Sequence, residues 1–438
     1  MDWNRILDEA VHYLQEYIRV DTVNPPGNEI EGARFLQKIL EAESVPCRIY
    51  EPSPGRGNLL ATLKGNGAKK PILLLNHMDV VPVEKDRWDV DPFGGVIRDG
   101  YLYGRGALDD KSMGIVEMMA LIILKREGVR LKRDILFFAA NGEETGGEWG
   151  VQWATENLHE LRECECALNE GGYIILDEDG SPSRYEISNG QKVIFQLKVK
   201  ATGTSGHASM PQSDNPNVKL VHGLERLSHW ETPFIVLPMV KEYFMKMAPK
   251  QPPDRREYFQ DIERGLEDPT FSKWLTSNPL YNAMVRNTVT LTVLQAGNKV
   301  NVIPSESTAL IDCRLLPGIS KGDFLKEIKE KLGGEVDVDS VSHDHSYPAS
   351  SVDTDLYRAI ERVAAQSDPD CPVVPTLLPG GTDARFLRKK GITVYDFCPF
   401  RLTENEMLRV HGNNERIALE NLRFGMSLMT EIVKEVAT

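Results

Sequence analysis

The sequence has few cysteines, no long apolar run and no excess of positive charge. Its six cysteines among 438 residues are scattered, which excludes a disulfide framework, and we expect all six to be reduced. No stretch approaches the roughly 20 apolar residues that a membrane-spanning helix needs. The formal net charge of −14 disfavours nucleic acid and anionic membranes as general partners, although it does not exclude a small anionic substrate.

The chain is long enough for more than one hydrophobic core. At 438 residues two domains are expected, and contents of 41% hydrophobic and 26% charged residues are those of an ordinary globular protein. Residues 1–20 carry acidic side chains throughout and have apolar residues at helical spacing, unlike a signal peptide. We therefore expect a cytoplasmic protein with no membrane partner.

The stretch LLLNHMDVVP, residues 73–82, combines an apolar run with two polar groups at its end. Three consecutive leucines are typical of the end of a buried strand. His77 and Asp79 lie two positions apart, so in an extended segment they point to the same side. Open α/β sheets bind their ligands at this end of their strands. By itself the pair is equally compatible with a satisfied histidine beside a solvated aspartate.

The pattern of elements changes twice along the chain. Residues 1–190 alternate between helix and strand patterns, which predicts an α/β domain with a mixed, mostly parallel sheet and helices on both faces. Residues 191–344 follow the order β-α-β-β-α-β and predict an inserted α+β, ferredoxin-like lid domain. An extra insertion of uncertain structure spans about 232–285. From 345 to 438 the α/β character returns and completes the first domain. The dipeptide Asp-Gly at 99–100 predicts a hairpin turn.

Two finer predictions concern segments beside candidate functional residues. The short strand ECALNE should end at Glu170, and the buried strand DILFFAAN should end just before Glu143 and Glu144. The last helix should run from about 414 to 436.

Several polar side chains follow buried runs or lie in glycine-rich loops. Two imidazoles and several carboxylates without a thiolate suit zinc or a similar divalent ion. Carboxylates gathered in one place raise each other's pKa values unless cations lie among them, and two metal ions about 3.5–4 Å apart would meet that need. The side chains in question are His77, Asp79, Asp109, Glu143, Glu144, Glu170 and His411. Each motif alone is a weak signal, because Glu-Glu pairs are common on solvated helix faces.

Taken together, the motifs resemble those of one metallopeptidase family. In chain order they are NHMDVVP, GRGALDDKS, NGEETGG, NEGG, GTSGHASMP, NVIP, DCRLLPG, GGTDARF and HGNNE. Their order and approximate spacing are similar to those of the aminoacylase, succinyl-diaminopimelate desuccinylase and carboxypeptidase G family, peptidase family M-20. The resemblance covers essentially the whole chain. The insertion before NTVTLTVLQAG looks most like the branch of carboxypeptidase S and the secreted N-acyl-amino-acid synthase/hydrolases.

The resemblance implies two divalent metal ions, with zinc as the expected metal and cobalt or manganese as alternatives. His77 and Glu170 would hold one ion, Glu144 and His411 would hold the other, and Asp109 would bridge both.

Two further aspartates would have supporting roles. Asp79 would accept a hydrogen bond from the far ring nitrogen of His77 and so fix its tautomer. Asp110 adjoins the bridging residue and is interpreted as structural.

The resemblance also assigns two catalytic groups. Glu143 would be the general base, taking a proton from the attacking water and returning it to the departing amine. His207, in GTSGHASMP, would stabilise the developing oxyanion, often in the partner subunit of a dimer, which implies domain closure, dimerisation or both. A surface-loop histidine is the alternative for His207. The insertion at 232–285 leaves a homodimer open, because it would cover the usual dimer surface.

Four residues match positions associated with substrate binding. The guanidinium of Arg314 suits a bidentate grip on a carboxylate, and an ion pair with Asp312 or another acid is its alternative. Asn301, in NVIP, and the loop containing Gly381 and Thr382 would add polar contacts.

The leading hypothesis is therefore a di-zinc hydrolase that cleaves an amide bond next to a free carboxylate, as a carboxypeptidase, dipeptidase or N-acyl-amino-acid amidohydrolase. Its partner would be a small peptide or acyl amino acid. The alternatives are a dinuclear-metal phosphoesterase, since two-metal sites also serve phosphoryl transfer, and a non-catalytic binding protein that kept the fold. A dedicated base at Glu143 and an arginine for a carboxylate disfavour the first, and the complete ligand set disfavours the second.

Overall fold

The computed structural model describes residues 2–341 and 347–438, which divide into two compact units. The first unit comprises residues 2–189, 350–376 and 382–438, and the second comprises 190–341, 347–349 and 377–381. The predicted boundary between residues 344 and 345 lies outside the described residues.

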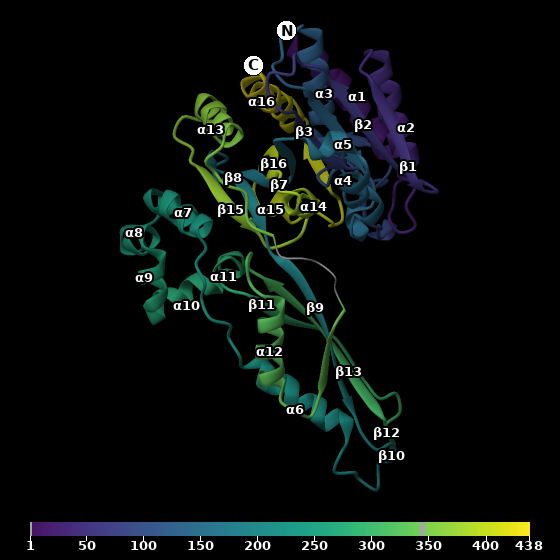
Figure 1. The fold of residues 1–438 in the computed structure, drawn as a ribbon, viewed down its shortest axis with the longest axis vertical. Helices are drawn as coiled ribbons and strands as arrows, with labels where there is room; N and C mark the ends of the chain where they lie inside the picture. Colours follow the sequence, from purple (N-terminus) through teal and green to yellow (C-terminus); the bar gives the residue numbers. More distant parts are fainter. Residues whose placement is uncertain (1, 342–346) are drawn as a thin grey trace. The chain divides into compact units, whose positions relative to one another are not determined.

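A mixed sheet forms the centre of the first unit (Figure 1). Its eight strands within the described residues are, in spatial order, β1 (Cys47–Ser53), β2 (Arg56–Leu63), β6 (Ile135–Ala140), β3 (Ile72–His77), β7 (Cys166–Leu176), β16 (Thr393–Leu402), β8 (Pro182–Gln191) and β15 (Val373–Leu378). The four central strands β6, β3, β7 and β16 are mutually parallel, and antiparallel strands flank them. This arrangement confirms the predicted α/β fold.

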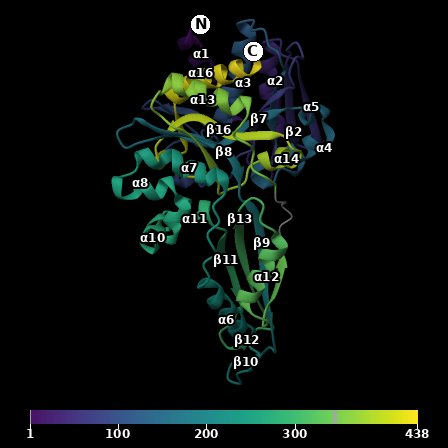
Figure 2. The same ribbon diagram turned by 60° about the vertical axis from the view of Figure 1, so that its left-hand side comes forward.

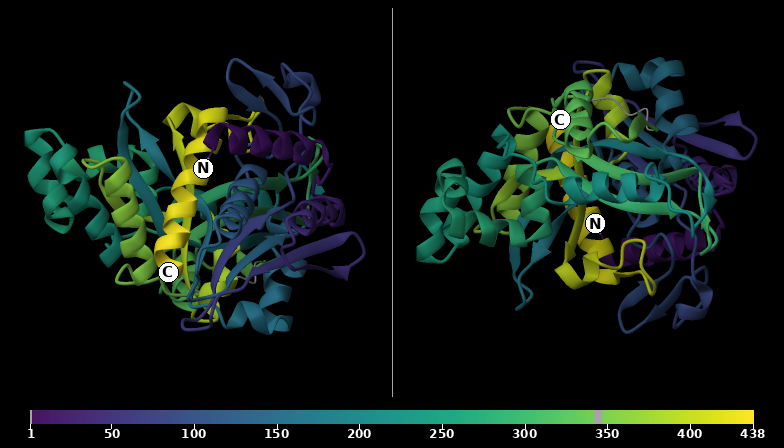
Figure 3. Two further views of the ribbon diagram at one scale, coloured as in Figure 1. Left: turned by 90° about the horizontal axis from the view of Figure 1, so that it is seen from above. Right: turned by 90° about the horizontal axis from the view of Figure 1, so that it is seen from below.

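Helices cover both faces of this sheet because its central strands are apolar on both sides. Leu74 and Phe137 belong to the core shared with one helix layer, and Leu73 and Phe138 belong to the core shared with the other. The first layer contains α1 (Trp3–Arg19), α2 (Glu29–Ala42), α3 (Lys111–Arg126), α13 (Asp355–Ser367) and α16 (Leu419–Ala437). The second contains α4 (Trp153–Asn157), α5 (His159–Arg162) and α14 (Ala384–Lys389). Figure 3 shows α1 and α16 side by side.

A buried lysine ties the end of α1 to the start of α3. Lys111 is inaccessible to solvent, and its Nζ donates to the carbonyl oxygens of Tyr17 at 3.0 Å and Val20 at 2.7 Å. The last carbonyls of a helix have no partner within the helix, so the ammonium group takes the place of a cap. Burial lowers the pKa of Lys111 to about 7.

A small three-stranded sheet joins two loops that are distant in sequence. It consists of β4 (Val96–Arg98), β5 (Tyr101–Tyr103) and β17 (Arg416–Ala418) in the order β17-β5-β4. Asp99 and Gly100 both have positive φ, at 53° and 79°, as a tight hairpin turn requires. The hairpin prediction is therefore confirmed.

The second unit contains the predicted ferredoxin-like arrangement (Figure 2). Its antiparallel sheet has the order β11-β13-β9-β14, in which the first and third strands of the chain order are central. The elements are β9 (Val193–Thr202), α6 (Pro216–Ser228), β11 (Thr288–Ala296), β13 (Glu306–Leu315), α12 (Lys321–Leu332) and β14 (Asp337–Ser340), and a short β10 (Gly206–His207) pairs with β12 (Val302–Ile303).

The insertion at 232–285 is helical. Its helices are α7 (Pro238–Met247), α8 (Pro253–Gln260), α9 (Ile262–Glu267), α10 (Pro269–Ser277) and α11 (Pro279–Val285). Asp268 and Asn278 cap α10 and α11, each just before a proline at the first helical position. Aromatic rings hold the helices together, with the Phe244 ring 5.2 Å from Phe259 and 5.4 Å from Tyr281.

Two element boundaries differ from the sequence predictions. The strand expected to end at Glu170 continues to Leu176, because β16 lies alongside β7 and supplies hydrogen-bonding partners beyond that point. The last helix starts at Leu419 instead of about 414, because residues 416–418 pair with β5 as strand β17.

The remaining short elements are helical turns. They are η1 (Lys85–Arg87), η2 (Glu143–Thr145), η3 (Glu148–Gln152), η4 (Ala248–Lys250) and α15 (Glu404–Met407). Among the described residues, no helix combines the length and the apolar character needed to cross a bilayer. All six cysteines have free thiols, as expected.

Truncating the central strand β6 should destabilise the first unit. Phe137 is fully buried in the core, so we expect Phe137→Ala to lower the free energy of unfolding by about 3–5 kcal/mol. Thermal and urea unfolding would measure the change. Leu408→Ala, at a side chain that is 79% exposed, is the control. Equal effects of the two substitutions would contradict the assigned core.

Candidate metal centre

The candidate residues lie together at the carboxyl ends of the central strands of the sheet. His77 is the last residue of β3, and Glu143 and Glu144 lie in η2, just beyond the end of β6. Glu170 lies within β7, and Asp109 directly precedes the N-cap residue of α3. Because parallel strands end on the same side, segments far apart in sequence meet here.

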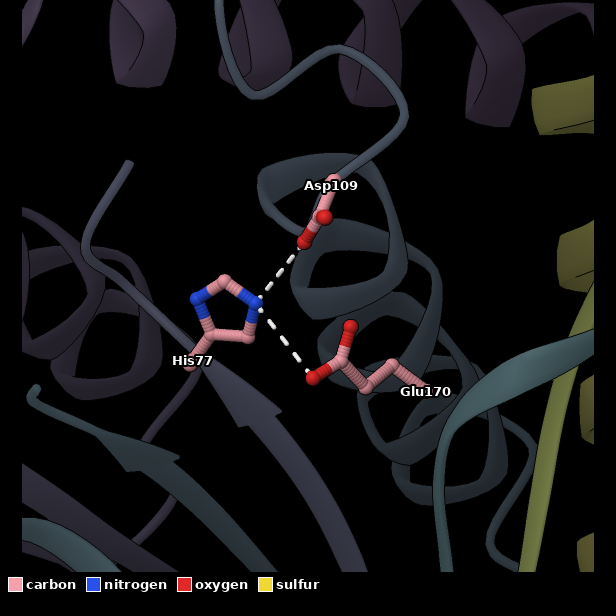
Figure 4. Close-up of side chains that lie close together, drawn as sticks. All are labelled: His77, Asp109 and Glu170. Carbon is pink, nitrogen blue, oxygen red and sulfur yellow. Dashed lines mark hydrogen bonds and ion pairs between the residues drawn. The ribbon is translucent and has the colours of Figure 1, made fainter. Parts of the chain in front are cut away.

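The first group of potential ligands consists of His77, Asp109 and Glu170 (Figure 4). His77 Nε2 lies 2.9 Å from Asp109 Oδ1 and 3.5 Å from Glu170 Oε1. Figure 4 shows both carboxylates directed at the same ring nitrogen. One ligand atom from each residue lies within 4.8 Å of the others, close enough to surround a single ion.

The second group consists of Asp109, Glu144 and His411. His411 Nε2 lies 3.0 Å from Asp109 Oδ2 and 3.0 Å from Glu144 Oε1. The two oxygens of Asp109 therefore face different imidazoles, Oδ1 toward His77 and Oδ2 toward His411. A carboxylate in this position has the geometry of a bridge between two cation sites.

The electrostatic environment of the two ligand groups favours bound protons or cations. Burial and the neighbouring Asp109 carboxylate raise the pKa of Glu170 to about 7, against the opposing effect of His77. The Asp109 and Glu144 carboxylates raise the pKa of His411 to about 10. Burial alone would lower the pKa of His77, but the surrounding carboxylates outweigh it and raise it well above its usual value. Nitrogen and oxygen donors crowded in this way fit divalent cations, which would replace the protons.

Asp79 supports the site through main-chain contacts. Its carboxylate accepts the N–H groups of Glu143 and Glu144 at 3.1 Å each. The Nδ1 of His77 lies 3.0 Å from the main-chain oxygen of Asp79 and 3.5 Å from its carboxylate. The ring nitrogen therefore lies nearer the carbonyl than the carboxylate of Asp79, and the predicted hydrogen bond to that carboxylate stays a prediction.

Asn24 is a supporting residue that the sequence analysis did not single out. Its Nδ2 lies 2.8 Å from Asp79 Oδ2 and 2.8 Å from the hydroxyl of Thr145, so it joins Asp79 to η2. Asn24 begins the sequence NPPG, whose composition indicates a turn. Asparagine before a proline gives no local signal of a contact 55 positions away.

Asp110 does not lie in either ligand group. It is fully buried, and its Oδ2 accepts the main-chain N–H of His77 at 3.3 Å. The peptide bond between Asp109 and Asp110 is cis.

The predicted oxyanion residue His207 and the predicted substrate residues Asn301 and Arg314 lie in the second unit. His207 is exposed in β10, and its Nδ1 lies 2.7 Å from the hydroxyl of Ser209. The main-chain oxygen of Asn301 accepts the N–H of Ala208. Arg314 forms an ion pair with Asp312, at 2.6 Å from Nε to Oδ1, which is the alternative that the sequence left open.

Thr382, in the first unit, is linked through Arg385 to the turn after η2. Thr382 is buried, and Arg385 donates to its carbonyl at 3.1 Å and to the carbonyl of Gly146 at 3.0 Å. Gly381 is the last residue of the chain segment assigned to the second unit.

Comparisons with known proteins agree with this geometry. The model of the family described as "Peptidase family M20/M25/M40" matches residues 73–435. The chain is 29% identical to the probable carboxypeptidase S-like 2 of Dictyostelium discoideum, over 83% of this chain and 71% of that protein. It is 28% identical to the N-fatty-acyl-amino acid synthase/hydrolase PM20D1 of Homo sapiens, over 93% and 82% of the two chains.

A solved structure has the same fold. It is the M20 family metallo-carboxypeptidase Sso-CP2 from Sulfolobus solfataricus, with a TM-score of 0.73 and 21% identity. The superposition covers 98% of this chain and 99% of that one.

Replacing Asp79 with its amide should loosen the site. In Asp79→Asn the side-chain NH₂ would oppose a main-chain N–H, leaving a buried donor unpaired at a cost of about 1–3 kcal/mol. We expect a lower melting temperature and about 10–100-fold weaker metal binding, measured by thermal unfolding and by metal retained after dialysis. Asp370→Asn, at an exposed position, is the control. If both variants behave alike, Asp79 has no supporting role.

Proposed function

The chain belongs to peptidase family M20/M25/M40, and on that premise we propose that it is a di-metal hydrolase of amide bonds that adjoin a free carboxylate. The family membership confirms the resemblance found in the sequence and makes the chain a hydrolase acting on amide bonds. A carboxypeptidase, a dipeptidase and an N-acyl-amino-acid amidohydrolase all fall within the proposal, since they differ in the acyl side of the substrate.

The position of Asp109 is the observation that carries the proposal. Its two oxygens face His77 and His411, each of which has a second carboxylate beside it. Imidazole and carboxylate donors without thiolates suit zinc, and cobalt or manganese would accept the same ligands. His77 and Glu170 would hold one ion, Glu144 and His411 the other, and Asp109 both.

A bound pair of such cations would supply Lewis acidity, polarising a substrate carbonyl and lowering the pKa of water to about 7. The protein supplies the proton transfer. Glu143 precedes the ligand Glu144, and its main-chain N–H is held by Asp79 at 3.1 Å. Burial and the Glu170 carboxylate raise the pKa of Glu143 well above its usual value, which favours a group that accepts a proton.

In the proposed reaction a water molecule attacks the amide carbonyl while the carboxylate of Glu143 accepts its proton. Glu143 then donates that proton to the amine nitrogen as the C–N bond breaks. The imidazole of His207 would donate a hydrogen bond to the developing oxyanion. These roles need no other acid or base.

The second unit would supply the substrate contacts. Asp312 orients the guanidinium of Arg314 through Nε and Nη2, and a guanidinium has further N–H groups for a substrate carboxylate. Asn301 and Gly381, together with Thr382 of the first unit, would add polar contacts. Residues 191–344 would therefore act as a lid.

A homodimer would use the edge of the lid sheet. β11 is an edge strand that exposes Leu291 and Leu294, at 49% and 54%. An apolar exposed edge is a surface on which a second copy would pair.

Glu143→Gln should abolish turnover and keep metal binding. The amide cannot accept a proton, so we expect kcat to fall by about 10²–10⁴ or more, with metal content unchanged. Initial rates on N-acyl amino acids and dipeptides, with metal analysis of the same samples, would measure both. Glu148→Gln, at an exposed position close by, is the control. Near-full activity of Glu143→Gln would exclude Glu143 as the base.

Removing metal should stop hydrolysis reversibly. Dialysis against a chelator is expected to abolish amide cleavage and to lower the melting temperature, because a ligand at 100 times its Kd stabilises a protein by about 2.7 kcal/mol. Zinc, cobalt or manganese should restore both. A phosphodiester tested in parallel should not be cleaved. Chelator-resistant amidase activity, or phosphodiester cleavage alone, would refute the proposal.

A further inference from the structure

Two loops that carry potential metal ligands are joined by one buried ion pair. Arg105 lies in the loop between β5 and α3, four residues before Asp109. Glu415 lies in the loop between α15 and β17, four residues after His411. Arg105 Nη1 donates to Glu415 Oε2 at 2.6 Å, and the two side chains are 2% and 0% exposed.

The other contacts of this pair reach the ligand residues themselves. Glu415 Oε1 accepts the main-chain N–H groups of Leu108 at 2.7 Å and Asp109 at 3.1 Å. Arg105 Nη2 donates to the main-chain oxygen of His411 at 3.1 Å. One ion pair thus holds the backbone of two of the three residues in the second ligand group.

The backbone at His411 needs such a restraint. His411 has φ of 60°, in the left-handed region that non-glycine residues rarely adopt. Its neighbour in the loop, Asn414, has φ of 57°. A hydrogen bond to the carbonyl of His411 fixes the peptide plane that follows this residue, and with it the direction of the imidazole.

Stability alone does not account for burying these charges. A buried ion pair is expensive to desolvate and often contributes no more to folding than apolar side chains of the same size. The fork of an arginine, however, can bind a carboxylate and a carbonyl at once in a fixed geometry. The pair therefore serves to hold the main chain of the two loops in a fixed position relative to one another.

We propose that Arg105 and Glu415 are positioning residues that clamp Asp109 and His411 together and so build the second of the two cation positions. The proposal rests on the di-metal function proposed above. It further implies an asymmetry between the two positions. The second group draws two of its three residues from the clamped loops, whereas His77 and Glu170 of the first group lie on strands β3 and β7.

The test is a titration of the metal-free, full-length protein with Co²⁺, followed by the visible absorption of bound cobalt and by equilibrium dialysis. The wild-type chain should bind two ions. In Arg105→Lys one ammonium group cannot reach both acceptors, and in Glu415→Gln the charge of the pair is lost. Each variant should keep one ion with nearly the wild-type affinity and bind the second about 10–100-fold more weakly.

Arg133→Lys is the matched control. Arg133 is as buried as Arg105, with a side chain 2% exposed, and it pairs with Glu165 at 2.8 Å. It lies before β6 and Glu165 before β7, at the opposite ends of these strands from the ligand groups. This variant should bind two ions like the wild type.

A double substitution assigns the weakened position. In a His411→Ala background, which already lacks a ligand of the second group, Arg105→Lys should produce no further loss of cobalt affinity. Additive losses would show that the arginine acts on the fold in general and would overturn the proposal.

Three other results are decisive. If Arg105→Lys and Glu415→Gln both titrate like the wild type, the clamp is refuted while the di-metal function stands. If Arg133→Lys loses the second ion as well, the effect is a general one and the clamp is again refuted. If the wild-type chain binds fewer than two cobalt ions, the proposed function itself fails and the clamp fails with it.

Discussion

Carboxylates that share a buried space repel one another, and the first unit gathers several of them at the carboxyl ends of its central strands. Within the two ligand groups found among the described residues, the three carboxylates of Asp109, Glu144 and Glu170 face two imidazoles, so pairing inside these groups does not balance their charge. The backbone must hold them against this repulsion. Strands β3 and β7 do so because they lie in the middle of the sheet, with helices on both faces and parallel neighbours on both sides. A rigid scaffold of this kind is a condition for a site built from like charges.

Three other buried carboxylates share one way of supporting the site. Each accepts a main-chain N–H from a residue of the two ligand groups while remaining outside those groups itself. Asp79 accepts from Glu144, Asp110 from His77, and Glu415 from Asp109. These buried carboxyl groups therefore order the main chain at three of the five candidate ligands.

The sequence predicted the central strands and the segments that carry the candidate ligands because local patterns hold that information, whereas the roles of these residues came from the family resemblance and stay predictions. β3 and β6 are apolar runs that stop at polar residues, and their ends supply His77 and the Glu143–Glu144 pair. The end of β7 was predicted wrongly, because Gly171 and Gly172 indicate a break whereas the neighbouring strand β16 continues the pairing. Pairing partners distant in sequence decide such cases, and local propensity does not contain them.

The contacts that support the candidate ligands could not be predicted from the sequence for the same reason. Arg105 and Glu415 stand inside two recognised motifs, yet nothing in either motif shows that they form a pair across 310 positions. The helices of the insertion were not predicted, although the sequence holds local signals for two of them. Asp268 and Asn278, each followed by proline, are N-terminal helix signals that the charged composition of the segment obscured.

The end of the first helix supplies hydrogen-bond acceptors for the buried ammonium group of Lys111, in addition to packing against the core. The family model begins to match at residue 73, so the first helix lies outside the segment that this model covers. Yet the carbonyls of Tyr17 and Val20 are the acceptors of a lysine that adjoins Asp110. A fragment trimmed to residues 73–435 would remove both acceptors and leave the buried ammonium group without these hydrogen bonds. Hydrogen bonding of the buried groups therefore sets the boundaries of a stable fragment, and the limits of the family model are a poor guide to them.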